Sequence, residues 1–301
     1  SATLRDFRYA LPDLSADVQQ FSARTADGFW LKELRSQVAL AERGLQLRET
    51  SLTTSNLEWT SRLLQIDYPL LAPAPPPLAE LRIDSDARLL ARNLRDLSYF
   101  YPPLDSLDFF RQHRDRKLQL RLRAKGSLAE LDLRSLTLRG LGLDAQLRGQ
   151  LRQLDRVDQL ALDLQLARLQ TSGPAIRSWL PDSLLPAYVQ LPDSLFARGS
   201  IRGHREAFTA DVQVQTRRDT LPATTQFRAV VRARDIEIPD RAFLEVRVDT
   251  FVIDRADLLA YLPPDLLPPF VELPEAFILT CSVYFLQLQG WVGLIPGGGM
   301  E

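Results

Sequence analysis

The sequence contains very few of the side chains that most often bind zinc or build disulfide frameworks. It has one cysteine, Cys281, and two histidines, His113 and His204, among 301 residues. A single cysteine excludes an internal disulfide framework and fits a reducing as well as an oxidising compartment. The histidines have no cysteine or carboxylate at zinc-ligand spacing, so we expect no metal and no cofactor and interpret both as solvated surface residues.

An excess of charge of one sign is also missing. The chain has 37 basic and 38 acidic residues, and almost all of the basic ones are arginine. Because a balanced charge creates no field that attracts nucleic acid or an anionic membrane surface, we expect no nucleic-acid partner.

Long apolar runs are absent, and so is a signal peptide with a basic start and an apolar core. The single methionine is Met300, so the start codon is not in the sequence. We therefore expect a piece of a longer chain, with any membrane anchor or targeting signal outside these residues.

No group of residues forms a complete catalytic motif. Ser200, His204 and Asp211 invite comparison with a catalytic triad, but no nucleophile elbow surrounds Ser200, which falls in a strand-like segment. Gly297–Gly299 lacks the Lys-Ser/Thr of a phosphate-binding loop, which favours a flexible tail. We expect a protein without enzymatic activity.

An internal repeat is the most informative feature that the sequence does contain. The stretch WLPDSLLPAYVQLPDSLFARGSIRG, Trp179–Gly203, aligns without gaps on Tyr261–Phe285, 82 positions later. A fainter copy begins near Tyr99 and reaches Ala124-Lys125-Gly126, which corresponds to Ile201-Arg202-Gly203. A period of roughly eighty residues predicts several short elements in each unit.

Each repeat is expected to carry one short helix. Helical spacing of leucines begins at Ser85-Asp86 and ends at Pro102-Pro103, and similar apolar clusters run over Ile176–Pro181 and Leu258–Pro263. Asp254 and Asp257 flank the start of the last cluster, which favours helix capping over an acid–base pair.

Strands with alternating apolar and polar residues fill most of the rest of the chain. Asp27-Gly28 and Arg43-Gly44 predict turns between strands in the first segment, and Pro73–Pro77 predicts an extended surface loop. Alternation places the apolar residues of a strand on one face of a sheet and its Arg, Asp and Gln on the other. The residues that we assign to the apolar face are Leu118, Leu120, Leu122, Leu131, Leu133, Leu136, Leu138, Leu160, Leu162, Leu164, Val212 and Val214.

The pattern leaves two points open. Leu151–Val157 is compatible with a turn of helix, whereas Leu160–Leu166 favours a strand. One short helix per repeat is too little to cover six or seven strands, so we expect a closed or curved sheet. Its apolar face could be a sealed core or an open groove.

The short helix ending in Tyr/Trp-x-Pro, the Leu-Pro loop and the glycine-marked strands resemble TamB, within the AsmA-like group of bridge-forming lipid-transport proteins. The residues that carry the resemblance are Asp96–Pro102, Leu191–Gly203 and Phe21–Phe29, and the likeness to Bacteroidota-type members spans nearly the whole chain. Two positions depart from the repeat, because Cys281 replaces Gly199 and Phe285 replaces Gly203.

The resemblance implies a long sheet curled into a U-shaped trough, the β-taco, which carries phospholipid acyl chains across the periplasm. It implies an inner-membrane anchor before these residues and an outer-membrane barrel protein as partner after them. The repeat predicts a first portion over 1–80, repeat units over 81–172 and 173–255, and a truncated unit over 256–301. The alternatives are a structural or adhesive β-solenoid with a sealed core, and a scaffold for outer-membrane barrel assembly.

Overall fold

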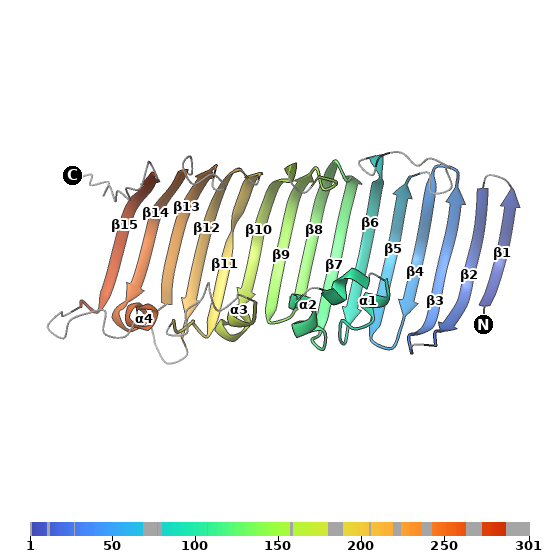
Figure 1. The fold of residues 1–301 in the computed structure, drawn as a ribbon, viewed down its shortest axis with the longest axis horizontal. Helices are drawn as coiled ribbons and strands as arrows, with labels where there is room; N and C mark the ends of the chain where they lie inside the picture. Colours follow the sequence, from blue (N-terminus) through green and yellow to red (C-terminus); the bar gives the residue numbers. More distant parts are fainter. Residues whose placement is uncertain are drawn as a thin grey trace. The chain divides into compact units, whose positions relative to one another are not determined.

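The computed structural model describes most of the chain and shows a mainly β protein with few short helices (Figure 1). The residues described are 2–10, 13–26, 28–68, 77, 80–100, 102–106, 108–156, 159–179, 189–204, 206–218, 224–235, 243–262 and 273–286. The chain divides into two compact units, unit 1 with residues 1–141 and 146–160, and unit 2 with residues 142–145 and 161–301.

The strands are long, mostly ten to twelve residues. Those up to residue 152 are β1 (Ala2–Ala10), β2 (Asp13–Arg24), β3 (Trp30–Ala41), β4 (Gly44–Thr53), β5 (Leu57–Asp67), β6 (Arg82–Ala91), β7 (Leu118–Ser127), β8 (Glu130–Gly140) and β9 (Leu143–Arg152). The later strands are β10 (Ala161–Thr171), β11 (Ser194–His204), β12 (Ala207–Arg217), β13 (Thr224–Arg234), β14 (Phe243–Asp254) and β15 (Ala276–Leu286).

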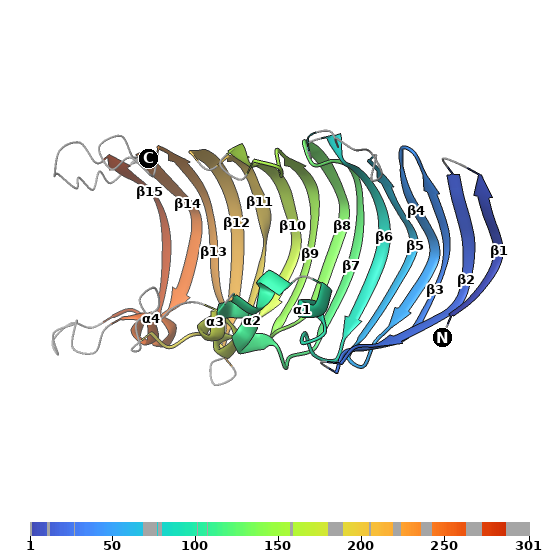
Figure 2. The ribbon, with the colours of Figure 1, turned by 45° about the vertical axis from the view of Figure 1, so that its right-hand side comes forward.

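Both units are antiparallel meanders. In unit 1 each strand from β1 to β8 pairs with the next one along the chain, and in unit 2 the same holds from β10 to β15. Within the described residues, neither sheet closes on itself or curls strongly. The expected mainly β fold with few short helices is confirmed; the strong curl that the resemblance implies is not seen at this level, although single strands are bowed along their length (Figure 2).

β-Bulges explain why the strands bow. In β8 the apolar residues change from odd to even positions between Leu133 and Leu136, and the register with β7 shifts there. The register of β5 against β6 shifts in the same way between Ser61 and Leu63. A bulge inserts one residue, bends the strand and restores the alternation to the same face. The parity change is visible in the sequence.

In each unit, short helices lie in long connections at the ends of the strands (Figure 1). Unit 1 has α1 (Leu97–Phe100), the 3-10 helix η2 (Pro102–Ser106) and α2 (Asp108–His113) between β6 and β7. Unit 2 has α3 (Gly173–Trp179) between β10 and β11, and α4 (Arg255–Tyr261) between β14 and β15. Among the described residues no helix is long and apolar enough to cross a membrane.

The expected helix from Ser85 to Pro102 is wrong over its first half. Residues Ser85–Ala91 belong to strand β6, which pairs with β5 on one side and with β7 on the other, and helix begins only at Leu97. Hydrogen-bonded pairing with a strand on each side outweighs the leucine spacing, since intrinsic helix preference is a weak determinant. The expected helices near Ile176 and Leu258 are confirmed as α3 and α4.

The internal repeat is confirmed by the positions of the elements. The helices α3 and α4 start at Gly173 and Arg255, and the strands β11 and β15 start at Ser194 and Ala276, each pair 82 residues apart. One period therefore contains a short helix, α3, followed by the four strands β11 to β14, and the next period begins with α4 and β15.

The fainter copy is supported by backbone conformation. Gly126 in β7 and Gly203 in β11, which the sequence aligns, have φ angles of 140° and 135°. A Cβ atom on either would lie 2.2 Å from a carbonyl oxygen of the neighbouring strand. Both conformation and close approach therefore require glycine at these two positions.

Other expectations have mixed outcomes. The turns near Gly28 and Gly44 are confirmed, and Leu160–Leu166 is strand from Ala161 on. Leu151 lies in β9, and the helical turn left open at Leu151–Val157 is absent over its described part, where residues 154–155 form a turn. Pro73–Pro76, much of the Leu-Pro loops and Gly297–Gly299 lie outside the described residues, and the four predicted portions of the chain stay a prediction.

Candidate functional site

The apolar face of the unit 1 sheet brings together the leucines that alternation selected. Leu120 pairs with Leu89 on β6 and with Leu138 on β8, and Leu122 pairs with Leu136. The bulge in β8 places the odd-numbered Leu131 and Leu133 on the same face as the even-numbered Leu136 and Leu138. Leu118, Leu120, Leu122, Leu136 and Leu138 are half-buried, and Leu133 is buried.

Unit 2 has an equivalent apolar face. Leu162 and Leu164 on β10 face Gly203 and Ile201 on β11, and Val212 and Val214 on β12 face Gly199 and Ala197. Leu162, Leu164, Val212 and Val214 are all half-buried. Leu160 precedes the first residue of β10, so its predicted place within that strand is wrong by one position.

Small, buried residues mark where the strands bend. In unit 1, Ser36, Thr50 and Ser61 occupy adjacent strands and are 4%, 3% and 2% exposed. The hydroxyls of Ser36 and Thr50 are 2.8 Å apart, and the Ser61 hydroxyl donates to the carbonyl oxygen of Asp86 at 3.2 Å. Side chains converge on the inner side of a bend, where larger neighbours cover small residues. Alternation alone did not reveal this row of hydroxyls.

The helical connection of unit 1 covers one end of the apolar face. Leu94 and Phe110 from this connection form a buried cluster with Leu57 and Ala91 at the ends of β5 and β6. In Figure 2, α1 and α2 lie on the inner side of the bowed strands. The apolar face is therefore the inner face of the bow, and the helices leave its middle uncovered.

Exposed aromatic side chains border this covered end. The ring of Phe29, between β2 and β3, lies 4.7 Å from that of Tyr99 and 5.6 Å from that of Phe100 on α1. Tyr99 and Phe100 remain 44% and 52% exposed, and nearby Trp30 is 45% exposed. The edge of the apolar face thus presents aromatic surface to solvent.

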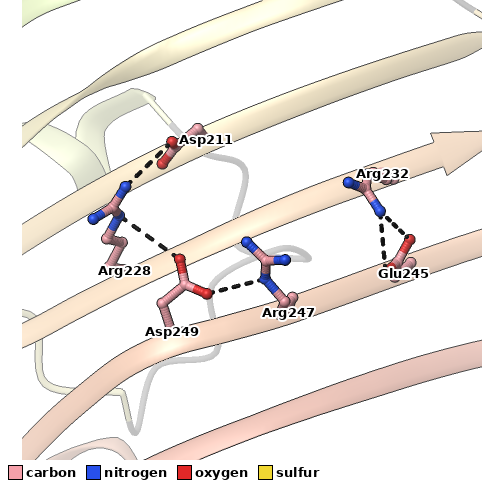
Figure 3. A network of polar contacts seen from close by, with 6 residues as sticks. All are labelled: Asp211, Arg228, Arg232, Glu245, Arg247 and Asp249. Atoms are coloured by element: carbon pink, nitrogen blue, oxygen red, sulfur yellow. Dashed lines mark hydrogen bonds and ion pairs between the residues drawn. The ribbon is translucent and has the colours of Figure 1, made fainter.

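The opposite face of the unit 2 sheet is a network of ion pairs (Figure 3). Arg228 lies between Asp211, at 3.7 Å, and Asp249, at 3.8 Å, while Arg247 contacts Asp249 at 3.0 Å. Arg232 contacts Glu245 at 3.1 Å. These solvated pairs stabilise the sheet by only about 0–1 kcal/mol each, so their main effect is on solubility and register.

A buried acid lies among the connections at the ends of the strands of unit 2. Asp257 on α4 is 1% exposed, accepts a hydrogen bond from the Nε of Arg218, and accepts another from the hydroxyl of Thr225 at 2.5 Å. Arg218 also donates to the carbonyl oxygens of Gln190 and Leu191, in the segment that follows α3. Arg218 therefore ties three connections together.

Tyr261 packs beside Arg218 and Asp257. The Arg218 guanidinium lies 5.3 Å from the centre of its ring. Burial, and then the charge of Asp257, raise the pKa of the Tyr261 phenol. Asp254 caps α4, because its carboxylate accepts from the backbone N–H of Asp257 at 2.8 Å, as its position before the helix predicted.

Unit 1 has a similar buried acid at its helical connection. Asp96, 6% exposed, accepts from the hydroxyl of Thr54 at 2.5 Å and from the backbone and side-chain amides of Asn56 at 3.0 and 2.8 Å. At the surface nearby, a hydrogen bond from Arg95 lowers the pKa of Asp115. Asp96 and Asp257 thus anchor helical connections to the sheet.

The residues weighed for catalysis do not form a site. Ser200 lies opposite Asp211 on the polar face, but His204 is four residues farther along β11, about 13 Å away at the usual strand rise. His113, the last residue of α2, is only 5% exposed, so its interpretation as a solvated residue is wrong; His204 is exposed. Within the described ranges no group of three or more His, Cys, Asp or Glu side chains could hold a metal ion.

Comparison with protein-family models, curated proteins and solved structures finds no match for this chain. The fold class is an antiparallel meander with one apolar and one polar face. The likeness to TamB stays a prediction from the sequence.

Proposed function

We propose that the apolar face binds the acyl chains of phospholipids, and that the chain is a non-enzymatic segment of a bridge carrying lipid between inner and outer membranes. The observation that carries the proposal is the half-buried state of Leu118, Leu120, Leu122, Leu136 and Leu138 in the middle of the unit 1 face. An apolar area of this kind, continuous across several strands, marks a binding surface on a soluble chain.

Acyl chains fit this surface better than a compact ligand does. The face is lined by leucine and valine. Its buried hydroxyls at Ser36, Thr50 and Ser61 form hydrogen bonds with one another or with the backbone. Each methylene that leaves water for such a face gains about 0.8 kcal/mol. The gain accumulates along a chain without any single essential residue, as transport requires.

The curled β-taco belongs to the same proposal. The bowed strands and their bulges provide curvature within single strands, and lipid occupancy would stabilise deeper curvature. A sealed β-solenoid would need a second layer over the leucines, whereas the helices of unit 1 cover only one end of its described face.

Photo-crosslinking tests the proposal with neighbouring residues on opposite faces. Val214 lies on the apolar face of β12, and exposed Gln215 lies on the polar face. With benzoylphenylalanine at position 214, the chain expressed in a Gram-negative host should crosslink to phospholipid, which mass spectrometry detects. Position 215 is the control and should give little lipid adduct.

Equal adducts at the two positions, or none at either, contradict lipid binding by the apolar face. A crosslinked strand of an outer-membrane barrel protein at position 214 would instead support a role in barrel assembly.

A further inference from the structure

The polar face of unit 1 contains a hollow whose charge is not balanced by the chain. Its volume is about 700 Å³, and it lies over the strands β5 to β9. It contains a single carboxylate, Asp86, and this group is already paired with Arg123 at 3.2 Å. The five arginines that line it are Arg62, Arg88, Arg121, Arg123 and Arg139.

Three of these arginines lack an acidic partner. In the part of the chain that the structure describes, Arg62, Arg88 and Arg121 form no ion pair. Arg88 and Arg121 are also direct cross-strand partners. Like charges in this position destabilise a sheet. An anion between them would turn this repulsion into attraction.

The remaining polar groups of the hollow suit oxyanions. Thr60 pairs with Arg88 and Thr137 with Arg121, so a hydroxyl stands beside each guanidinium. Gln119 and Gln146 add side-chain amides to the lining. A guanidinium presents two parallel N–H groups that match a phosphate bidentately. We propose that this hollow binds a soluble or lipid-borne compound with two or more phosphate groups.

An acidic peptide fits the hollow less well. The strands β5, β6 and β7 are each paired on both sides, so no free edge is available for strand addition. Ala87 and Leu120 are the apolar residues of the lining, and both belong to the apolar set of their strands, so they provide little anchor for a hydrophobic side chain on this face. A compact, multiply charged ligand needs neither.

This inference goes beyond the proposed lipid binding, because it concerns the other face of the sheet. Acyl chains can occupy the leucine face without any ligand at the arginines, and the reverse also holds. The two proposals can therefore fail separately.

Calorimetric titration of the whole chain with inorganic diphosphate tests the site. Diphosphate should bind, and the Arg88→Gln and Arg121→Gln variants should each weaken binding about tenfold, as expected for the loss of one charged hydrogen bond. Arg232→Gln, in unit 2, is the matched control, because it removes an arginine that is already paired with Glu245. It should leave the affinity unchanged.

Thermal unfolding shows whether a variant that has lost diphosphate binding is still folded. Arg88→Gln removes a like-charge contact, so its melting temperature should not fall. Vesicles containing cardiolipin, a lipid with two phosphate groups, identify the source of the phosphate: loss of both vesicle and diphosphate binding in the variants supports a lipid head group, and loss of diphosphate binding alone supports a soluble ligand. Absence of diphosphate binding, or equal binding by parent and both variants, overturns the proposal.

Discussion

Unit 1 and unit 2 fasten their helical connections to the sheet with a buried aspartate, but the donors differ. In unit 1 the donors to Asp96 are the neutral groups of Thr54 and Asn56. In unit 2 the donors to Asp257 are the hydroxyl of Thr225 and the charged guanidinium of Arg218. The anchor in unit 2 therefore contains a buried ion pair, and loss of its acid leaves a cation behind.

The two anchors also have a feature in common. Thr54, between β4 and β5, donates to an acid in the connection that follows β6, and Thr225, near the start of β13, donates to an acid in the connection that follows β14. The hydroxyl-to-carboxylate contact is common to both, whereas the second donor varies with the length and path of the connection. The following predictions separate these contributions.

The largest effect is expected for Asp257→Ala. Removal of one partner from a buried ion pair costs about 3–5 kcal/mol, because the remaining charge is unpaired. Arg218 is only 11% exposed and would be left in this state. We expect the free energy of unfolding of unit 2 to fall by this amount, measured by hydrogen exchange of the α4 amides.

The double variant Arg218→Met/Asp257→Leu is the control for this prediction. Apolar replacement of a whole buried pair is often neutral or stabilising. We expect it to recover most of the lost stability. If the double variant were as unstable as Asp257→Ala, then packing of α4, rather than charge, would account for the loss.

A smaller loss is expected for Asp96→Ala in unit 1. It leaves the Thr54 hydroxyl and the Asn56 amides without their acceptor but leaves no buried charge. An unsatisfied buried donor costs about 1–3 kcal/mol. Denaturant unfolding should show a decrease near the middle of that range, and Thr54→Val should show less. A loss as large as that of Asp257→Ala would remove the distinction between the two anchors.

The helix caps should differ by less again. The carboxylate of Asp254 accepts from a backbone N–H at 2.8 Å, whereas the equivalent Ser172 hydroxyl accepts from Ala175 at 3.4 Å. Loss of a good cap costs about 1 kcal/mol. Hydrogen exchange should show that Asp254→Ala destabilises α4 by this amount and that Ser172→Ala destabilises α3 by less. Equal losses would mean that the distances do not reflect cap strength.

The strands were predictable because alternation is a local signal. In β7 the residues from Leu118 to Ala124 alternate between half-buried or buried and exposed, as the sequence indicated. The same local method failed at Ser85–Ala91, where pairing with β5 and β7 decides the structure. Strand β6 depends on pairing with segments that are distant in the sequence, so leucine spacing alone could not reveal it.

The residues of the apolar face were predictable from the sequence, but the contacts between neighbouring strands were not. Periodicity selected Leu120 and Val214, and a change of parity marks the bulge in β8. The row of Ser36, Thr50 and Ser61 requires knowledge of which strands are adjacent. The hollow at Arg88 and Arg121, which form no ion pair among the described residues, likewise depends on cross-strand register. The net charge of the whole chain is close to zero and does not reveal this local excess of positive charge.

The smallest effect is a pH dependence confined to unit 2. Burial and the charge of Asp257 raise the pKa of Tyr261 in the folded state above its unfolded value, which is about 10. The neutral phenol is thus favoured by folding, so its contribution is complete below pH of about 10 and is lost as pH rises through the folded pKa. Hydrogen exchange of α4 should show a steeper alkaline loss of stability in the parent chain than in Tyr261→Phe. Tyr99→Phe, in unit 1, leaves Tyr261 in place and should retain the parent slope; the same slope in all three chains would contradict the assignment to Tyr261.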